Sequence, residues 1–440
     1  MTQQTPSPEV TLQPDDRILI FAPHPDDETI ATGGIIQKAV AMGLPVHVAF
    51  LTYGDNNETS FMLYRKRPTL KAKAVQGMGL VRHEEAVAAT GVLGLKPDQL
   101  TFLGYPDFRT LVIWTEHWGE VEPCDSMFTR TNVVPYPNAL RPGTPYRSEE
   151  ILADVKTVLR DFKPTKVFVS HPGDHNPDHQ SLYLYTRIAL WDLASEMQQP
   201  ALYPFLVHHP EWPAPDGYHP ELASPPPDRL AGEGVWLTNP LSQDQIERKH
   251  QAVQEHKSQW RLGHKLLESF MRTNELFGDL PTLALGGTQA GAATSTGEGR
   301  RPEAIPTQLT HRERAKYVGV EQRSLELDGH GNLIATIEFS RPLTSAVLAS
   351  VYLFGYRPDV PFAQMPKLNL RTDDLAHAVL DGKRRLPGSP ATVERSDNRF
   401  KMTVPLSLLG DPTHILGSAR TSLAAVPFDW VAWRVLELTK

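Results

Sequence analysis

Two short polar segments combine histidines with carboxylates in a pattern that a metal site requires. The first, HPDDE, begins at His24 and contains Asp26 and Asp27, and the second, HPGDHNPDHQ, begins at His171 and contains His179. Imidazole nitrogens and carboxylate oxygens bind Zn²⁺, and a catalytic zinc site takes three such ligands and leaves a fourth position for water. A further carboxylate beside that water can serve as a general base. The two segments therefore predict metal-assisted hydrolysis.

The first segment also has a purely structural interpretation. Asp26, Asp27 and Glu28 stand where a helix is expected to begin, and the helix dipole stabilises negative charge at that end. The adjacent His24 and Pro25 favour a ligand site over this interpretation, although one motif alone does not decide between the two.

In the second segment, two familiar metal patterns fail. His171 and His175 have the i, i+4 spacing of helical zinc motifs, but Pro172–Gly173 between them is incompatible with a helix. Asp174 begins a run that imitates a calcium loop, but its sixth position is His179 instead of glycine and its twelfth is not glutamate.

The expected strands bring both segments to one edge of a sheet. Apolar runs at 17–22 and 166–170 each end directly before one segment. In open α/β sheets, ligands bind outside the carboxyl ends of the strands. A helix that opens around His179 would then complete a ligand set with His24 and Asp27.

The first half of the chain alternates strands with helices, which predicts an α/β fold with a Rossmann-like, mostly parallel sheet and helices on both faces. Polar inserts at 106–147 and 199–231 interrupt this alternation and are typical of walls around a site. The remaining expected elements are strands at 46–52, 100–104, 203–208 and 234–237, and helices at 28–42, 64–90, 148–162 (with Ser148 as its N-cap), 177–197 and 242–276.

Three parts are expected along the chain. Residues 1–285 form the catalytic domain, residues 286–308 are a small-residue linker, and residues 309–440 form a β-rich accessory domain that resembles a β-sandwich. Runs at 324–328 and 333–339, separated by Gly-His-Gly-Asn, predict a hairpin there. We expect this domain to serve an accessory or oligomerisation role, and a carbohydrate-binding role is the alternative.

Composition excludes several classes of protein. Hydrophobic residues make up 40% of the 440 residues and the formal net charge is −7, which argues against nucleic acid as the main partner. Cys124 is the only cysteine, so no internal disulfide can form, and any metal must be held by His, Asp and Glu. With no apolar run long enough for a membrane span and no secretory signal pattern, we expect a cytoplasmic protein.

The chain resembles the LmbE-like, or PIG-L, family of zinc-dependent N-deacetylases. Its two signature motifs are similar to APHPDDE, which contains His24, and to NPDH, which ends at His179; VRHEEAVAATGVLG, LGYPD and HKSQW resemble secondary motifs in the same order. The resemblance covers about residues 15–280. It implies a Rossmann-like hydrolase that removes acetyl groups from GlcNAc-containing conjugates, among other amides.

The resemblance also implies a role for each matching residue. His24, Asp27 and His179 match the zinc ligands, and Asp26 matches the general base. Three further matches are Arg82 and Asp107, which align with positions that contact the polar substrate, and Asp178, which matches a carboxylate behind the ligands.

One position departs from the family pattern. The family usually has histidine where this chain has Asn176, and that histidine stabilises the oxyanion or acts as an acid. Asn176 can donate a hydrogen bond to an oxyanion but cannot deliver a proton, so His175 is an alternative for this role. Outside the motifs, His208 and His209 either line the cleft or pack in the insert.

The leading expectation is a Zn²⁺ hydrolase that acts on an N-acetylated amino sugar. A His₂Asp site also accepts Fe²⁺ and Co²⁺. Two alternatives stay open: the same chemistry on another amide, such as a thiol conjugate or an acylated natural product, and a non-catalytic sugar- or nucleotide-binding module. The absence of a G-x-G-x-x-G loop counts against nucleotide binding. A homo-oligomer is also open.

Overall fold

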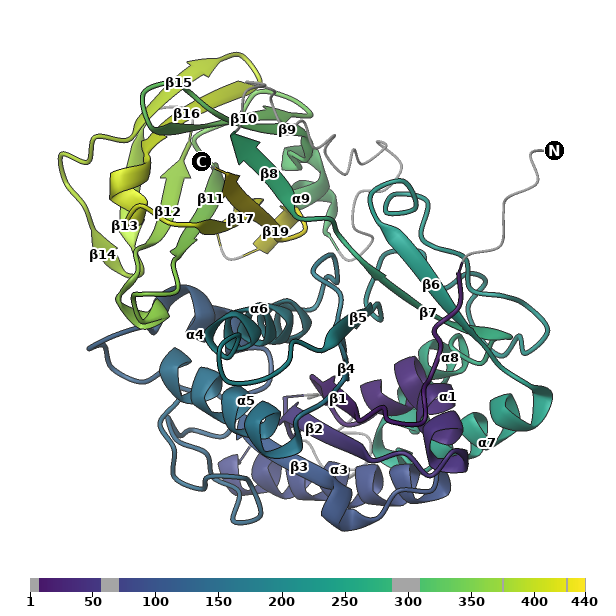
Figure 1. The fold of residues 1–440 in the computed structure, drawn as a ribbon. Coiled ribbons are helices and arrows are strands. Elements are labelled where there is room, and N and C mark those ends of the chain that lie inside the picture. The colour runs from purple at the N-terminus through teal and green to yellow at the C-terminus, as the bar shows by residue number, and fades with distance from the viewer. Residues whose placement is uncertain (1–7, 57–70, 287–308, 374–375, 425, 440) are drawn as a thin grey trace. The chain divides into compact units, whose positions relative to one another are not determined.

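The chain folds into two compact units, Met1–Asp279 and Leu280–Lys440 (Figure 1). The computed structural model describes residues 8–56, 71–286, 309–373, 376–424 and 426–439. Most of the expected linker, residues 287–308, and the first part of the helix expected at 64–90 lie outside these residues.

The first unit contains one seven-stranded sheet. Its strands are β1 (Ile18–Ala22), β2 (Val46–Thr52), β3 (Leu100–Tyr105), β4 (Lys166–Ser170), β5 (Ala201–Phe205), β6 (Val235–Pro240) and β7 (Asn274–Asp279). They lie in the order β3-β2-β1-β4-β5-β7-β6. The pairs among β1 to β5 are parallel, whereas β7 is antiparallel to both β5 and β6. The prediction of a mostly parallel α/β sheet is confirmed.

The strand order reverses between β1 and β4, which lie side by side in parallel register. All five residues of β1 are buried, and so are four of the five in β4. Because both faces of these strands are covered, their sequences are continuous apolar runs rather than alternating ones. The loops that follow them open at this reversal, which is where α/β folds bind ligands.

Two groups of helices pack around this sheet (Figure 1). Among them, α1 and α3 both contact α7, and α4 and α5 both contact α6. The helices are α1 (Asp27–Ala41), α3 (Ala72–Val92), α4 (Thr110–Glu116), α5 (Ser148–Phe162), α6 (Pro177–Asp192), α7 (Gln243–Gln254) and α8 (Lys257–Glu268).

Two details of the sequence interpretation are wrong. The single helix expected at 242–276 is α7, α8 and the start of β7, because its last residues pair with β6 across the sheet. A short apolar run fits a helix or a strand equally well until its partner is known. Ser148 is the first residue of α5 instead of its N-cap, and its hydroxyl donates to the backbone oxygen of Ile113.

The second unit is built from strands β8 to β19. Their bounds are β8 Leu283–Gly286, β9 Val320–Leu327, β10 Asn332–Phe339, β11 Val347–Tyr356, β12 Lys367–Thr372, β13 His377–Asp381, β14 Arg384–Arg385, β15 Thr392–Ser396, β16 Arg399–Pro405, β17 His414–Leu423, β18 Val426–Trp430 and β19 Arg434–Thr439. The short α-helix α9 (His311–Lys316) precedes β9.

These strands form two sheets that share one apolar core. The smaller has the order β15-β16-β10-β9, and the larger has the order β14-β13-β12-β11-β17-β19-β8, with β18 paired to β17. The expected hairpin is confirmed, because β9 and β10 pair in antiparallel register. Strand β8 pairs with β19, so residues 283–286 belong to the second unit, although we expected 283–285 to end the first unit and 286 to begin the linker.

In the described part of the chain, no helix is long and apolar enough to cross a membrane.

Candidate metal and catalytic site

A tight turn between β1 and α1 holds two of the expected ligands together. The backbone N–H of His24 donates to Asp27 Oδ2 at 3.0 Å, and the backbone N–H of Asp27 donates to the His24 carbonyl oxygen at 3.3 Å. This reciprocal pair places the His24 ring nitrogen Nδ1 3.1 Å from Asp27 Oδ2. Both side chains are buried.

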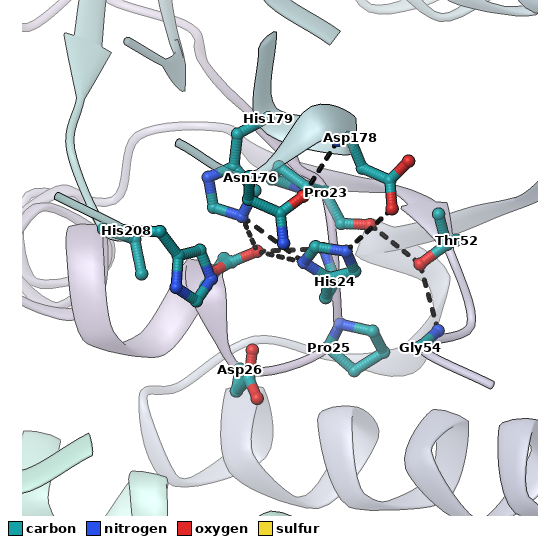
Figure 2. A network of polar contacts seen from close by, with 12 residues as sticks. Pro23, His24, Pro25, Asp26, Thr52, Gly54, Asn176, Asp178, His179 and His208 are labelled. Atoms are coloured by element: carbon teal, nitrogen blue, oxygen red, sulfur yellow. Dashed lines mark hydrogen bonds and ion pairs between the residues drawn. The ribbon is translucent and has the colours of Figure 1, made fainter. Parts of the chain in front are cut away.

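The third expected ligand arrives from the neighbouring helix α6. His179 Nε2 lies 3.1 Å from Asp27 Oδ2 and 3.3 Å from His24 Nδ1. Zinc at about 2.0–2.1 Å from its ligands in a tetrahedron separates them by about 3.3 Å. The three donor atoms therefore already have the spacing of one face of a zinc tetrahedron. Figure 2 shows the rings of His24, His179 and His208 gathered together, with Asp26 across from His179 and Asn176.

Each expected ligand histidine turns its other nitrogen toward a buried carboxylate. His24 Nε2 lies 3.2 Å from Asp178 Oδ2 and 3.1 Å from Asp107 Oδ1, and His179 Nδ1 lies 3.1 Å from Asp174 Oδ2. Metal-binding histidines usually have such partners, which fix the ring and its tautomer. The donor set and its surroundings thus fit Zn²⁺.

Asp174 is a residue that the sequence interpretation missed. Its sequence context offers only the start of a calcium-like loop that the following residues do not complete. The available signal is its place in the loop that follows the buried strand β4, since a carboxylate there can reach the same edge as the expected ligands. Asp174 is fully buried and accepts hydrogen bonds from the backbone N–H groups of Asn176, Val207 and His208 at 2.9 Å.

A second group of donors, His24, Asp107 and Asp178, lies on the other side of the His24 ring. Here both oxygens of Asp178 already accept protein hydrogen bonds. Oδ2 accepts from Phe108 N at 2.5 Å, and Oδ1 accepts from the backbone N–H of Thr110 at 3.1 Å and from its hydroxyl. This group therefore suits the support of His24 and of the loop before α4 better than metal binding.

The electrostatics of the ligand group favour a bound cation. Burial raises the pKa of Asp27, but His179 and His24 lower it well below its ordinary value. Burial lowers the pKa of His179, but Asp174 and Asp27 raise it to about 9. Without metal, the carboxylates thus hold protons on the imidazoles. A metal ion can take the place of those protons because ligand histidines must be neutral.

Asp26, the expected base, occupies a strained position at the start of α1. It is the N-cap residue with φ 128° and ψ −33°, and its side chain makes no cap hydrogen bond. A non-glycine residue in such a region costs on the order of 1–3 kcal/mol and persists where the surroundings enforce it. Its Oδ2 lies 3.1 Å from Arg82 Nη2. Burial and Asp27 raise the pKa of Asp26 and Arg82 lowers it, with a result of about 6.

Two buried residues hold the backbone of Asp26. Its N–H donates to Glu28 Oε2 at 2.9 Å, while Glu28 Oε1 lies 3.1 Å from His256 Nε2 and accepts the Thr29 hydroxyl at 2.7 Å. His256 and Glu28 are both fully buried. Arg82 adds hydrogen bonds to the carbonyl oxygens of Pro25 and Gly54, at 2.6 and 2.8 Å.

The other departing helix, α6, begins conventionally. Asn176 is its N-cap with φ −79° and ψ 130°, and its Oδ1 accepts the N–H of Asp178 at 2.8 Å. Pro177 follows at the first helical position, where its missing N–H has no cost. The side-chain oxygen of Asn176 is therefore committed, and its amide N–H₂ group remains as a donor.

Most of the expected site residues line one cavity of about 160 Å³. Among the expected site residues, it brings together His24, Asp26, Asp27, Arg82, Asp107 and Asn176 in its lining. Asp178 and His179 lie behind this surface, in contact with His24. His175 does not line the cavity, and its ring packs 5.4 Å from the ring of His209.

His208 lines the cavity and is the histidine for which the sequence left two roles open. Burial and the neighbouring His179 lower its pKa to about 4, so the ring is neutral near pH 7.

Two carboxylates of the first unit, Asp55 and Glu275, lie outside the cavity lining. Asp55 accepts the Tyr136 hydroxyl, and Glu275 binds Lys249 at 2.8 Å in a buried pair between helix and sheet.

Comparison with known proteins identifies the region that carries this site. The model of the PIG-L family, described as GlcNAc-PI de-N-acetylase, matches residues 19–190. A 1D-myo-inositol 2-acetamido-2-deoxy-alpha-D-glucopyranoside deacetylase of Rhodococcus jostii is 28% identical over 186 residues, which is 42% of this chain and 56% of the relative. The deacetylase of the same name from Kribbella flavida is 31% identical over 173 residues, or 38% and 50% of the two chains. The chain thus spans about half the length of the curated relatives it matches.

Solved structures show weaker likeness. An N,N'-diacetylchitobiose deacetylase from Pyrococcus horikoshii has a TM-score of 0.37 and 19% identity, with 60% of this chain and 82% of that chain covered. A deacetylase from teicoplanin biosynthesis has a TM-score of 0.37 and 18% identity, with 57% and 89% covered.

Proposed function

Because residues 19–190 form a PIG-L (LmbE-like) domain, we propose that this protein is a zinc-dependent hydrolase that removes the acetyl group from an N-acetylated amino sugar, such as a GlcNAc-containing conjugate. The curated relatives that match this region are named as deacetylases of a GlcNAc–inositol conjugate, which supports the substrate class.

One observation carries the proposal. His24 Nδ1, Asp27 Oδ2 and His179 Nε2 lie 3.1–3.3 Å from one another, beside a cavity that also contains the carboxylate of Asp26. Three ligands together with a separate carboxylate are what hydrolysis by a metal-activated water requires. When bound, the metal would lower the pKa of a water molecule and polarise the amide carbonyl.

The remaining steps belong to the chain's own residues. Asp26, with its pKa raised to about 6, is ionised at neutral pH and takes a proton from the water that attacks the amide carbon. The C–N bond then breaks, and the same proton passes from Asp26 to the departing amine. Acetate and a free amine result. Arg82 keeps Asp26 oriented, and the Asn176 amide can donate to the carbonyl oxygen.

The cavity wall favours a second candidate substrate. Phe108 and Leu266 line it and are 47% and 42% exposed, and Leu267 and Val207 extend the same apolar surface. Such side chains offer no hydrogen bonds to the hydroxyl groups of a sugar. An amide that carries an apolar group, as in an acylated natural product, would cover these side chains. Each Å² of apolar surface buried in this way contributes about 25 cal/mol to the free energy of binding.

The experiment is acetate release by protein stripped of metal and reloaded separately with Zn²⁺, Fe²⁺ or Co²⁺. The substrates are N-acetylglucosamine, a GlcNAc–inositol conjugate and an N-acetyl amine whose amine part carries an apolar tail. We expect no release without metal and the fastest release from a GlcNAc conjugate with Zn²⁺. Turnover of the apolar amide alone would establish the second candidate. Lack of turnover on every amide by the loaded protein would refute the hydrolase and favour a binding module.

Three narrower expectations also remain proposals. We place the protein in the cytoplasm, we assign it no nucleic-acid partner, and we expect residues 309–440 to act as an accessory or oligomerisation domain. Measurement of the mass of the particle in solution by light scattering tests whether a homo-oligomer forms.

A further inference from the structure

His208 is an imidazole in the cavity to which neither the motifs nor the family match assigns a role. It follows β5, beyond the matched residues 19–190. Apart from the ligand His24, it is the only histidine among the described residues that line the cavity.

The backbone of His208 is tied to the ligand group through one carboxylate. Asp174 Oδ2 accepts the N–H groups of Val207 and His208 at 2.9 Å each, and the same oxygen lies 3.1 Å from Nδ1 of the ligand His179. The His208 carbonyl oxygen in turn accepts the N–H of His175 at 2.8 Å. The position of His208 is therefore fixed relative to the metal ligands by buried hydrogen bonds.

The ring of His208 faces the proposed ligands but lies farther from them than they lie from one another. Its centroid lies 4.9 Å from that of His179, at an interplanar angle of 73°. One of its nitrogens lies within 4.8 Å of the donor atoms of His24, Asp27 and His179. The three ligands are 3.1–3.3 Å apart, whereas the described residues give the His208 ring no hydrogen bond or ion pair. This spacing suits a substrate atom between His208 and the ligand group better than a fourth ligand.

We infer that His208 donates a ring N–H hydrogen bond to the carbonyl oxygen of the scissile amide as negative charge develops on that oxygen. This inference rests on the proposed hydrolysis. A neutral imidazole has one N–H to donate. A donor aimed at the developing oxyanion in a buried site accelerates acyl-transfer reactions by about 10²–10³.

The other donors on this side of the cavity leave room for such a role. Asn176 commits its side-chain oxygen to the helix cap, so only its amide group can reach the substrate. His175, which the sequence offered as an alternative, packs against His209 outside the lining. Asp26 faces the cavity as the base and carries the wrong charge to stabilise an oxyanion.

The test compares His208→Ala and His208→Gln with the parent, using His209→Gln as a control for the loop. Metal content is measured first. Calorimetry on the zinc-loaded proteins then gives the affinity for N-acetylglucosamine and for glucosamine with an N-methylphosphonyl group, whose tetrahedral phosphorus mimics the transition state. Acetate release from the best GlcNAc substrate gives kcat and KM.

We expect His208→Ala to keep about one metal ion per chain and to bind N-acetylglucosamine almost as the parent does, while kcat and the affinity for the phosphonyl compound each fall about 10²-fold. His208→Gln, whose amide can donate, should recover part of both losses, and His209→Gln should match the parent.

Three results would overturn the inference. Loss of metal in His208→Ala would make His208 a ligand, equal loss of affinity for both compounds would make it a ground-state contact, and an unchanged kcat would leave it no part in the reaction. A parent that binds metal but releases no acetate refutes the proposed function instead, so the two failures are distinguishable.

Discussion

The helices α1 and α6 follow neighbouring strands and each delivers a proposed metal ligand, yet they begin in opposite ways. Helix α6 has a regular cap, in which Asn176 accepts the N–H of Asp178 with ordinary backbone angles. Helix α1 begins at Asp26, whose φ is 128° and whose side chain caps nothing. The first arrangement favours stability, because a side-chain cap is worth about 1 kcal/mol. The start of α1 lacks this stabilising hydrogen bond and also has a strained backbone at Asp26.

The difference indicates which side chain can do chemistry. A carboxylate that accepts backbone N–H groups at a helix start has a lowered pKa and no free lone pair in the right place. Asp26 avoids this because its carboxylate accepts no cap hydrogen bond and lies instead beside Arg82 in the cavity lining, with a raised pKa. Under the proposed mechanism, the strain at α1 accompanies the catalytic carboxylate, while the regular cap of α6 precedes the expected ligand His179.

The largest expected effect comes from Asp26→Asn. Asparagine tolerates a positive φ and has the same shape, so fold and metal content should be preserved. Loss of the base should lower kcat by about 10³-fold, within the range for general base catalysis. Acetate release and metal analysis on the same preparation provide the measurement. A variant as fast as the parent would show that the strained start has no catalytic purpose.

Glu28→Gln should weaken the restraint on Asp26 and lower kcat about tenfold with little change in KM, as a misplaced catalytic group does. Thr29→Val is the matched control, because it removes the hydroxyl that donates to Glu28 Oε1 and leaves the backbone N–H of Thr29, which donates to the Asp26 carbonyl oxygen, in place. It should reduce the free energy of unfolding but leave kcat near that of the parent. Equal kinetic effects in the two variants would reduce Glu28 to a structural role.

Replacement of Arg82 should move the acid limb of the pH profile. Asp26 must be deprotonated to act as a base, so kcat/KM should rise with pH as Asp26 loses its proton. The midpoint of this rise should lie at or below pH 6, because the Asp26 pKa is about 6 without metal and a bound metal ion lowers it further. Arg82→Gln removes a positive charge that lowers this pKa, so the limb should shift upward by about 1–2 units. Arg82→Lys keeps the charge and should shift it less. An unchanged limb in Arg82→Gln would argue against Asp26 as the titrating base.

The smallest effect is expected at the regular cap. Asn176→Ala should lower the free energy of unfolding by about 1 kcal/mol, and Asn176→Asp should restore it because aspartate caps as well as asparagine does. Asp26→Asn should change the free energy of unfolding little, because its side chain makes no cap hydrogen bond and the asparagine oxygen can still accept from Arg82. Denaturant titration of the metal-loaded proteins measures all three. A large stability loss in Asp26→Asn would remove the contrast between the helices.

The parallel sheet and the ligand edge were predictable because β1 and β4 are short apolar runs that end directly before polar motifs. The same local patterns could not distinguish the end of a helix from β7, whose identity depends on its pairing with β6. Nor could they assign residues 283–286 to the second unit, since β8 is defined by its partner β19.

At the site, spacing and resemblance indicated His24, Asp27 and His179, and the structure places their donor atoms together. The contacts that support these residues could not be predicted from the sequence. Asp174 lies five residues before His179 but reaches across to the N–H of His208, which comes from a different loop. Burial and long-range hydrogen bonds decide such roles, and neither has a local sequence pattern.

The central claim is that α1 and α6 jointly hold a metal ion that hydrolysis needs, with Asp26 as a separate base. The most direct test measures zinc content and acetate release together in the parent, His179→Ala and Asp26→Asn. The account predicts about one Zn²⁺ and turnover in the parent, loss of both in His179→Ala, and zinc without turnover in Asp26→Asn. Zinc that stays bound in His179→Ala, or turnover that survives in it, would contradict the account.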